Sequence, residues 1–281
     1  MPPGRRTDEA PAPLTHPAVR AARRLRRRRG RVEAGRLLVE GPNAVDEAVH
    51  LLEQVFVTTP PATRVAETIA RCEQAGVPVT AVTERALDAL ADARTPQGIV
   101  GVAVRPPATL DVVDTASLLV VLDRIADPGN LGTVVRTADA AGADAVLLTR
   151  GSVDPTNAKA VRASAGSVFH LPVVDDVDPD VLAARCHAAG VRLVGAAADA
   201  VQRYDDVSWT EPTAIVFGNE AHGLSARMAH HLAMRVAVPI RRPERSGYHG
   251  HAESLNLATS AAIVVYEIAR HRGDGNRTWD R

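Results

Sequence analysis

The chain has 281 residues, enough for two modest domains or one large one, and its formal net charge at pH 7 is zero, which argues against a protein that is basic all over. Cys72 and Cys186 follow no metal-ligand spacing, so reduced thiols are expected. The amino-terminal residues contain no apolar signal segment, and no apolar run reaches the roughly 18 residues of a membrane span, so we expect a cytoplasmic protein without a membrane partner.

The first part of the chain predicts a disordered tail followed by a small α/β domain. Residues 1–16 are rich in proline and charge, and a basic helix is expected from His16 to about Arg29. Apolar and turn patterns then predict strands at 36–41, 54–59, 77–82 and 98–104, with helices at 42–51, 62–76 and 83–92 between them. We expect this domain to span residues 17–105 and a proline-containing linker to span 106–116.

The basic charge is nearly all arginine and is concentrated near the amino terminus. The stretch "VRAARRLRRRRGR", from Val19 to Arg31, has a charge density typical of a phosphate-binding surface, although a solvated helix face would also show it. The predicted RNA-contacting residues here are Arg23, Arg24, Arg26, Arg27, Arg28 and Arg29.

The second part of the chain predicts a larger domain over 117–272, followed by a tail at 273–281. Its buried-type apolar runs predict strands at 117–123, 145–149, 168–173, 191–197, 213–218 and 235–240. Helices are expected between them at 130–142, 156–165, 180–189 and 224–232, and a final one at 254–271. This alternation predicts a mostly parallel sheet with helices on both faces.

Three loops that follow predicted strands carry polar residues that a core does not require. They are "DRIADPGNLGTVVR" (123–136), "FGNEAHGLS" (217–225) and "VPIRRPERSGYHGHAESLNLA" (238–258). Because ligands of open parallel sheets bind outside the carboxyl ends of the strands, we expect these loops to meet at one site.

Together these loops resemble the SpoU/TrmH branch of the SPOUT methyltransferases, over roughly residues 117–272. The family pattern is Asn-x-Gly-x-x-x-Arg, then Phe-Gly-x-Glu-x-x-Gly, then a proline followed by Ser-Leu-Asn at the last helix. The matching residues are Asn130, Gly132 and Arg136, then Phe217, Gly218, Glu220 and Gly223, then Pro239, Ser254, Leu255 and Asn256. The stretches "RLLVEGPNAVDEAV" and "TPQGIVGV" of the first domain also resemble the ribosomal-protein-like substrate-binding domain of that family.

The resemblance implies transfer of a methyl group from S-adenosylmethionine to a ribose 2'-hydroxyl of RNA. It also implies a homodimer with active sites at the subunit interface and a deep trefoil knot in the catalytic domain. DNA is not an expected partner. The implied catalytic residues are Asn130, Arg136, Glu220, Ser254 and Asn256, and the implied cofactor-binding residues are Ala197, Gly218, Asn219, Val238, Ile240, Leu255 and Ala258.

The expected roles follow from the chemistry of these side chains. Arg136 matches the arginine proposed as the base in the family, but a guanidinium stays protonated near neutral pH, so orienting the hydroxyl and a phosphate is the more conservative of its two expected roles. Asn130 would hold Arg136 or the ribose, and Glu220 would pair with Arg136 or position Asn130. Alternatively, Asn130 and Ser254 could be simple helix caps. Gly218 would let the backbone approach the cofactor.

One stretch departs from the family pattern, because residues 241–252 form an insertion before Ser254. It contains His249 and His251 without a third ligand at a recognised spacing, so no metal is expected. The insertion could be a lid that contacts RNA or a surface loop. Arg162 could contact RNA or stabilise the core. The additional predicted RNA contacts are Arg162, Arg241, Arg242 and Arg245.

Ribosomal RNA is the favoured substrate, because members that act on transfer RNA often lack the first domain. Transfer RNA and a non-catalytic ribosome-assembly role are the alternatives, and both housekeeping and antibiotic-resistance modification fit the pattern. A nicotinamide-dependent dehydrogenase is disfavoured, because the chain has no G-x-G-x-x-G followed by an acidic ribose ligand.

Overall fold

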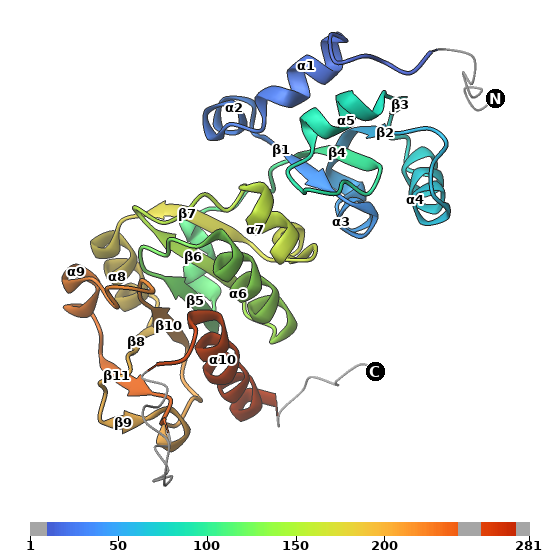
Figure 1. Cartoon of the computed structure of the whole chain (residues 1–281). Coiled ribbons are helices and arrows are strands. Elements are labelled where there is room, and N and C mark those ends of the chain that lie inside the picture. Colours follow the sequence, from blue (N-terminus) through green and yellow to red (C-terminus); the bar gives the residue numbers. More distant parts are fainter. Residues whose placement is uncertain (1–9, 241–253, 274–281) are drawn as a thin grey trace, which may run out of the picture. The chain divides into compact units, whose positions relative to one another are not determined.

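The computed structural model describes residues 10–240 and 254–273 of the chain (Figure 1). The chain forms two compact units. Unit 1 contains the residues up to Pro106 together with Thr156–Phe169, and unit 2 contains Pro107–Pro155 and the residues from His170 onward. The expected second domain therefore gives up one internal segment, residues 156–169, to unit 1.

Unit 1 is built on a four-stranded mixed sheet in the order β1-β4-β2-β3. Strands β1 and β2 run antiparallel to β4, whereas β3 runs parallel to β2. One face is covered by α1 and α5, whose buried residues join the same cluster as Phe56 and Val100. The strands are β1 (Arg36–Glu40), β2 (Leu52–Val57), β3 (Val79–Ala81) and β4 (Ile99–Val104), and the helices are α1 (Pro17–Arg24), α2 (Arg28–Ala34), α3 (Pro42–Glu47), η1 (Val49–Leu51), α4 (Thr63–Gln74), α5 (Glu84–Leu90), α7 (Ala158–Ala163) and η3 (Ser167–Phe169).

The basic segment forms two helices, α1 and α2, so the expected single helix over 16–29 is wrong. The buried Arg31 explains the break, because its Nη1 donates to the carbonyl oxygens of Leu25 at 2.9 Å and Arg26 at 3.0 Å. The chain also turns so tightly that a Cβ on Gly30 would lie 2.2 Å from the Arg24 carbonyl oxygen. A continuous helix is incompatible with that approach.

The segment given up by the second domain packs in unit 1 through α7, which contacts β1. Arg162 on α7 donates to Glu40 at 3.1 Å and to Asp92 at 2.8 Å. The Glu40 carboxylate, in turn, accepts from the backbone N–H groups of Asp92 and Ala93. This network gives Arg162 a structural role, and its contact with RNA stays a prediction.

Unit 2 is built on a seven-stranded sheet in the order β7-β6-β5-β10-β8-β11-β9, in which every pair of neighbours is parallel. The predicted parallel α/β class is therefore confirmed. The strands are β5 (Leu118–Leu122), β6 (Ala145–Thr149), β7 (Val173–Val177), β8 (Arg192–Ala196), β9 (Gln202–Arg203), β10 (Thr213–Phe217) and β11 (Met234–Ala237).

Helices cover both faces of this sheet because successive strand residues point to opposite sides. Leu119 and Val121 of β5 pack toward α8, η2 and α9. Helices α6 and α10 lie next to each other and contact β6 and β10 (Figure 1). The helices are η2 (Leu110–Thr115), α6 (Pro128–Ala140), α8 (Pro179–Ala188), η4 (Tyr204–Asp206), α9 (Ala226–Ala229) and α10 (Leu257–Gly273).

Several expected elements differ in position. The strand expected at 168–173 is instead η3 followed by β7, because a short apolar run does not distinguish a strand from a buried turn. Most of the expected linker at 106–116 is η2, which packs on α8 and is held there by Arg185, whose guanidinium pairs with Asp111 and Asp114. Among the described residues, no helix combines the length and apolar character that a bilayer crossing would need.

Candidate active site at the carboxyl ends of the strands

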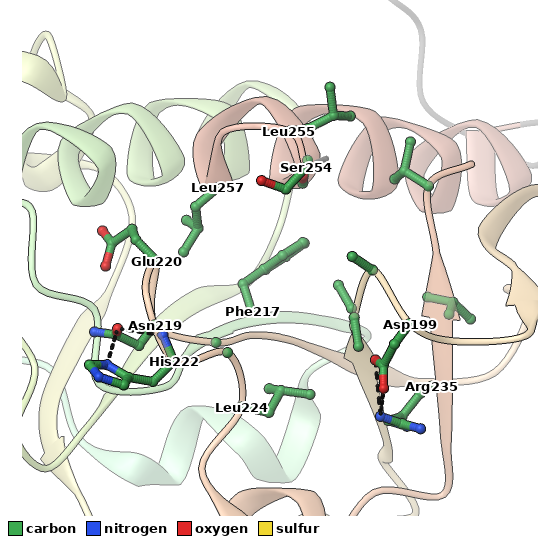
Figure 2. Close-up of a pocket in the computed structure, with 18 of the residues that line it drawn as sticks. Asp199, Phe217, Asn219, Glu220, His222, Leu224, Arg235, Ser254, Leu255 and Leu257 are labelled. Atoms are coloured by element: carbon green, nitrogen blue, oxygen red, sulfur yellow. Dashed lines mark hydrogen bonds and ion pairs between the residues drawn. The ribbon is translucent and has the colours of Figure 1, made fainter. Parts of the chain in front are cut away.

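A pocket of about 620 Å³ opens where loops leave β8, β10 and β11 and the chain enters α10 (Figure 2). Phe217, Leu224 and Leu257 contribute apolar side chains to its lining. Most of the residues expected at the cofactor and catalytic site also line it, namely Ala197, Gly218, Asn219, Glu220, Val238, Ile240, Ser254, Leu255 and Asn256. Two of the three expected loops thus meet at the pocket, and the first, 123–136, joins them through hydrogen bonds of Asn130 to Glu220 and Asn256.

Helix α6 begins in a way that frees Asn130 for other contacts. The N-cap is Asp127, whose Oδ1 accepts from the backbone N–H of Asn130 at 2.8 Å, and Pro128 occupies the first helical position. The alternative reading of Asn130 as a simple helix cap is therefore wrong. Its side-chain amide is available to neighbouring loops.

Two amides and one carboxylate form a directed chain beside the pocket. Asn256 Oδ1 accepts from the backbone N–H of Ala258 at 2.9 Å at the start of α10, which fixes its Nδ2 as a donor. Asn256 Nδ2 donates to Asn130 Oδ1 at 3.2 Å, and Asn130 Nδ2 donates to Glu220 Oε1 at 3.0 Å. The side-chain amides of Asn130 and Asn256 each have a second N–H that is not used in this series of hydrogen bonds.

Glu220 is the last member of this series of hydrogen bonds, and its carboxylate accepts in the ionised form. Burial would raise the pKa of its carboxyl, but the hydrogen bonds from Asn130 and from the backbone N–H groups of Ala126 and Asp127 outweigh it and lower the pKa below its usual range. A carboxylate with a lowered pKa is a weak base. Glu220 therefore orients Asn130, as one of the two expected roles stated.

Gly218 is required by its own loop. A Cβ there would lie 2.2 Å from the carbonyl carbon of Gly223 and 2.3 Å from the backbone nitrogen of Leu224. The two chain segments are also joined by a pair of 2.8 Å hydrogen bonds between the backbones of Asn219 and Gly223. A close approach to protein backbone therefore needs this glycine, and the expected approach to the cofactor stays a prediction.

The side chain of Asn219 is used within the loop. Its Nδ2 donates to the Arg124 carbonyl oxygen at 2.8 Å, and its Oδ1 accepts from the backbone N–H groups of Ala221 and His222. Figure 2 shows Asn219 turned toward the His222 ring. The side chain of Asn219 therefore stabilises the loop that lines the pocket.

Arg136 stands apart from the amide chain. It is exposed on α6, six residues after Asn130, which places it about 9 Å along the helix and about a third of a turn away. Across the described residues, its guanidinium has no hydrogen bond or ion pair with any side chain, Glu220 and Asn130 included. The expected contacts of Arg136 with these two residues are absent from the single chain.

The remaining expected residues have different positions. Ser254 lines the pocket but does not cap α10, because Asn256 does. Ala258 is buried in the first turn of α10 and is not among the residues that line the pocket. Arg241, Arg242, Arg245, His249 and His251 lie outside the described residues. Within the described ranges 10–240 and 254–273, no group of three or more His, Cys, Asp or Glu residues could hold a metal ion.

The sequence reasoning missed three residues that shape the site. Asp199 and Arg235 line the pocket as an ion pair, with Arg235 Nη1 3.1 Å from Asp199 Oδ2. Asp123 is fully buried at the end of β5, where it accepts from Thr149 Oγ1 at 2.9 Å and from the Ser225 backbone N–H at 2.6 Å. An aspartate directly after an apolar strand was a usable signal for Asp123, whereas nothing in the sequence pairs Asp199 with Arg235.

Comparison with known protein families decides the identity of both units. The model of the SpoU rRNA Methylase family matches residues 117–266, more than half of the chain. The chain belongs to the SpoU rRNA methylase family. The model of the MRM3-like substrate binding domain matches residues 16–101. The resemblance inferred from the three loops and from the first domain is therefore confirmed.

Individual proteins resemble this chain over about nine tenths of its length. The 23S rRNA (guanosine(2553)-2'-O)-methyltransferase RlmP of Bacillus subtilis (strain 168) is 33% identical over 253 residues, which cover 89% of this chain and 95% of RlmP. The AdoMet-bound rRNA methyltransferase from Sinorhizobium meliloti is 29% identical, with a TM-score of 0.78 over 92% of this chain and 97% of that one. The SpoU methyltransferase AviRb from Streptomyces viridochromogenes, in complex with AdoMet, is 29% identical, with a TM-score of 0.77 over 92% of this chain and 100% of that one.

Proposed function

We propose that this protein transfers the methyl group of S-adenosylmethionine to a ribose 2'-hydroxyl of ribosomal RNA. The observation that carries the proposal is the Asn256–Asn130–Glu220 chain, which holds two unused amide donors beside the pocket of a SpoU family domain. Relatives that act on ribosomal RNA by name, such as RlmP, support this substrate over transfer RNA. Ribosomal RNA and the cofactor both occur in the cytoplasm, which supports the expected location.

The pocket suits the cofactor in size and chemistry. Its volume of about 620 Å³ falls within the ~300–1,000 Å³ range of small-ligand sites. Phe217, Leu224 and Leu255 offer apolar surface to an adenine ring, and Gly218, which has no side chain, lines the pocket with its backbone. When bound, the cofactor supplies a methyl group that is already electrophilic, so the protein's task is to align the nucleophile.

The chain's own residues then position the ribose. The unused N–H groups of Asn130 and Asn256 would donate to oxygens of the target nucleotide, and Glu220 keeps Asn130 turned for this purpose. Arg136 would orient the 2'-hydroxyl or a neighbouring phosphate. Because Arg136 is exposed and makes no contact with this network among the described residues, we propose that it serves the pocket of a second copy in a homodimer. The trefoil knot stays a prediction.

RNA would first meet the arginine surface of α1 and α2. A broad depression there is lined by Arg20, Arg23, Arg24, Arg26, Arg27 and Arg29. Arg24 and Arg29 pair with Glu33, and Arg26 donates to the Ala89 carbonyl oxygen. The guanidinium groups of Arg20, Arg23 and Arg27 have no partner among the described residues, so these three are the most available for phosphates, and Arg23 and Arg27 are the two among them that the sequence predicts to contact RNA.

We therefore expect the double variant Arg23→Gln/Arg27→Gln to bind RNA more weakly at low salt and with a smaller salt dependence. Each lost phosphate contact should reduce the slope of log K against log salt by about 0.7–0.9. Filter binding or fluorescence anisotropy across a salt series measures both quantities. The control is Arg64→Gln/Arg71→Gln on α4, where both arginines pair with Asp46. An equal loss in both variants would contradict a dedicated surface.

A methyl-transfer assay tests the activity. Purified protein is incubated with labelled S-adenosylmethionine and, separately, with naked ribosomal RNA, ribosomal subunits and bulk transfer RNA. Label in ribosomal RNA or subunits is the expected result, and label only in transfer RNA would overturn the substrate. Cofactor binding without transfer to any pool, but with tight binding to ribosomal RNA, would instead support the alternative of a non-catalytic assembly factor.

A further inference from the structure

The pocket has two chemically different ends. Figure 2 shows Glu220, Asn219 and His222 at one end, the Asp199–Arg235 pair at the other, and Phe217 between them. Under the proposed function, the methyl group is delivered at the end with Glu220, where Asn130 and Asn256 would position the RNA ribose. The opposite end, with Asp199, therefore faces a part of the cofactor that does not react.

Asp199 is held in place at this end by two elements. It lies in a tight turn after β8, closed by a 3.1 Å hydrogen bond from the Ala200 N–H to the Ala197 carbonyl oxygen, and the Ala197 N–H is bonded to Val236 of β11. Arg235 of β11 reaches the carboxylate with Nη1 alone, at 3.2 Å to Oδ1 and 3.1 Å to Oδ2. A carboxylate has about four acceptor positions, so roughly two stay available.

The contribution of the Asp199–Arg235 ion pair to the stability of the fold is too small to explain why the two residues are placed here. The two side chains are 73% and 48% exposed, and exposed ion pairs of this kind contribute little to stability. Two free acceptor positions on one anchored carboxylate match the two donors of a vicinal diol. We propose, on the basis of the proposed function, that Asp199 accepts hydrogen bonds from the ribose 2'- and 3'-hydroxyls of S-adenosylmethionine and that Arg235 positions it.

Isothermal calorimetry on the full chain tests the proposal. Asp199→Asn should bind S-adenosylmethionine about 10- to 100-fold more weakly, because an amide presents an N–H to one hydroxyl in place of an acceptor. Arg235→Ala should lose less, since it removes only the anchor. The matched control is Asp205→Asn, which breaks another exposed pair, with Arg203, that does not line the pocket. It should bind like the unaltered protein.

Two smaller ligands identify the part of the cofactor involved. 5'-Methylthioadenosine keeps the ribose and lacks the amino acid, so Asp199→Asn should weaken its binding by a similar factor. An S-adenosylhomocysteine analogue without the 2'-hydroxyl should bind the unaltered protein more weakly than S-adenosylhomocysteine, and Asp199→Asn should weaken its binding by a smaller factor, because only the 3'-hydroxyl contact is left to lose. Weakening confined to ligands with the amino acid would overturn the ribose assignment, because Asp199 would then bind the ammonium group.

The controls separate this inference from the proposed function. If the unaltered protein binds no S-adenosylmethionine, the proposed function fails. If it binds, and Asp199→Asn binds equally well, only the role of Asp199 fails. Circular dichroism of each variant establishes that a change in affinity is not a loss of fold.

Discussion

We expect Gly218→Ala to bind S-adenosylmethionine far more weakly than the unaltered protein. The added Cβ would lie 2.2 to 2.5 Å from three backbone atoms of Gly223 and Leu224, and backbone cannot yield as a flexible side chain can. Relief requires breaking the paired hydrogen bonds between Asn219 and Gly223, which close the loop that carries Glu220. We expect more than about 100-fold weaker binding by calorimetry, and a destabilisation of about 1–3 kcal/mol typical of overpacking.

A second glycine variant controls for the loss of stability. Gly190 lies between α8 and β8, has a φ of +69°, and a Cβ there would meet nothing within 4 Å. Gly190→Ala should therefore cost stability through backbone strain, by about 1–2 kcal/mol, without altering cofactor affinity. Binding by Gly218→Ala within threefold of the unaltered protein would show that the loop tolerates a shift.

The sequence predicted which loops form the site, because each motif follows an apolar run and parallel strands bring their carboxyl ends to one edge. It could not predict how the residues divide their tasks. Asp127 and Asn130 are both good helix caps, and only the start of α6 at Pro128 assigns the cap to Asp127. Likewise, the motif places Gly218 correctly but does not reveal that the facing neighbour is backbone.

The differences in the fold have a similar origin. Residues 156–169 alternate with strands of the second domain in sequence, yet α7 packs on β1 of unit 1. The interaction that favours this arrangement is the Arg162–Glu40 pair, which joins residues 122 positions apart. Arg31 breaks the basic helix by binding carbonyl oxygens, which no helical periodicity encodes. Long-range polar contacts of this kind are invisible to local patterns.

We expect Arg136→Ala to lose most of its methyl-transfer activity and to bind the cofactor as tightly as the unaltered protein. The side chain does not line the pocket of its own chain and has no partner there among the described residues, so its loss should not disturb the Asn256–Asn130–Glu220 chain. Transfer should fall by about 100-fold or more, as for other residues that stabilise a transition state. Calorimetry and the labelled-methyl assay measure the two quantities. A proportional loss of both would contradict a role confined to catalysis.

Mixed dimers show which chain's pocket Arg136 serves. An Arg136→Ala chain keeps an intact pocket, and a Gly218→Ala chain keeps an intact arginine. If the site combines a pocket with the partner's arginine, random pairing makes about half of the dimers mixed, each with one complete site, and restores about one quarter of the full activity. If Arg136 serves its own pocket, co-expression restores nothing. Ala197→Phe, which fills the pocket from the β8 loop, replaces Gly218→Ala if that chain does not fold.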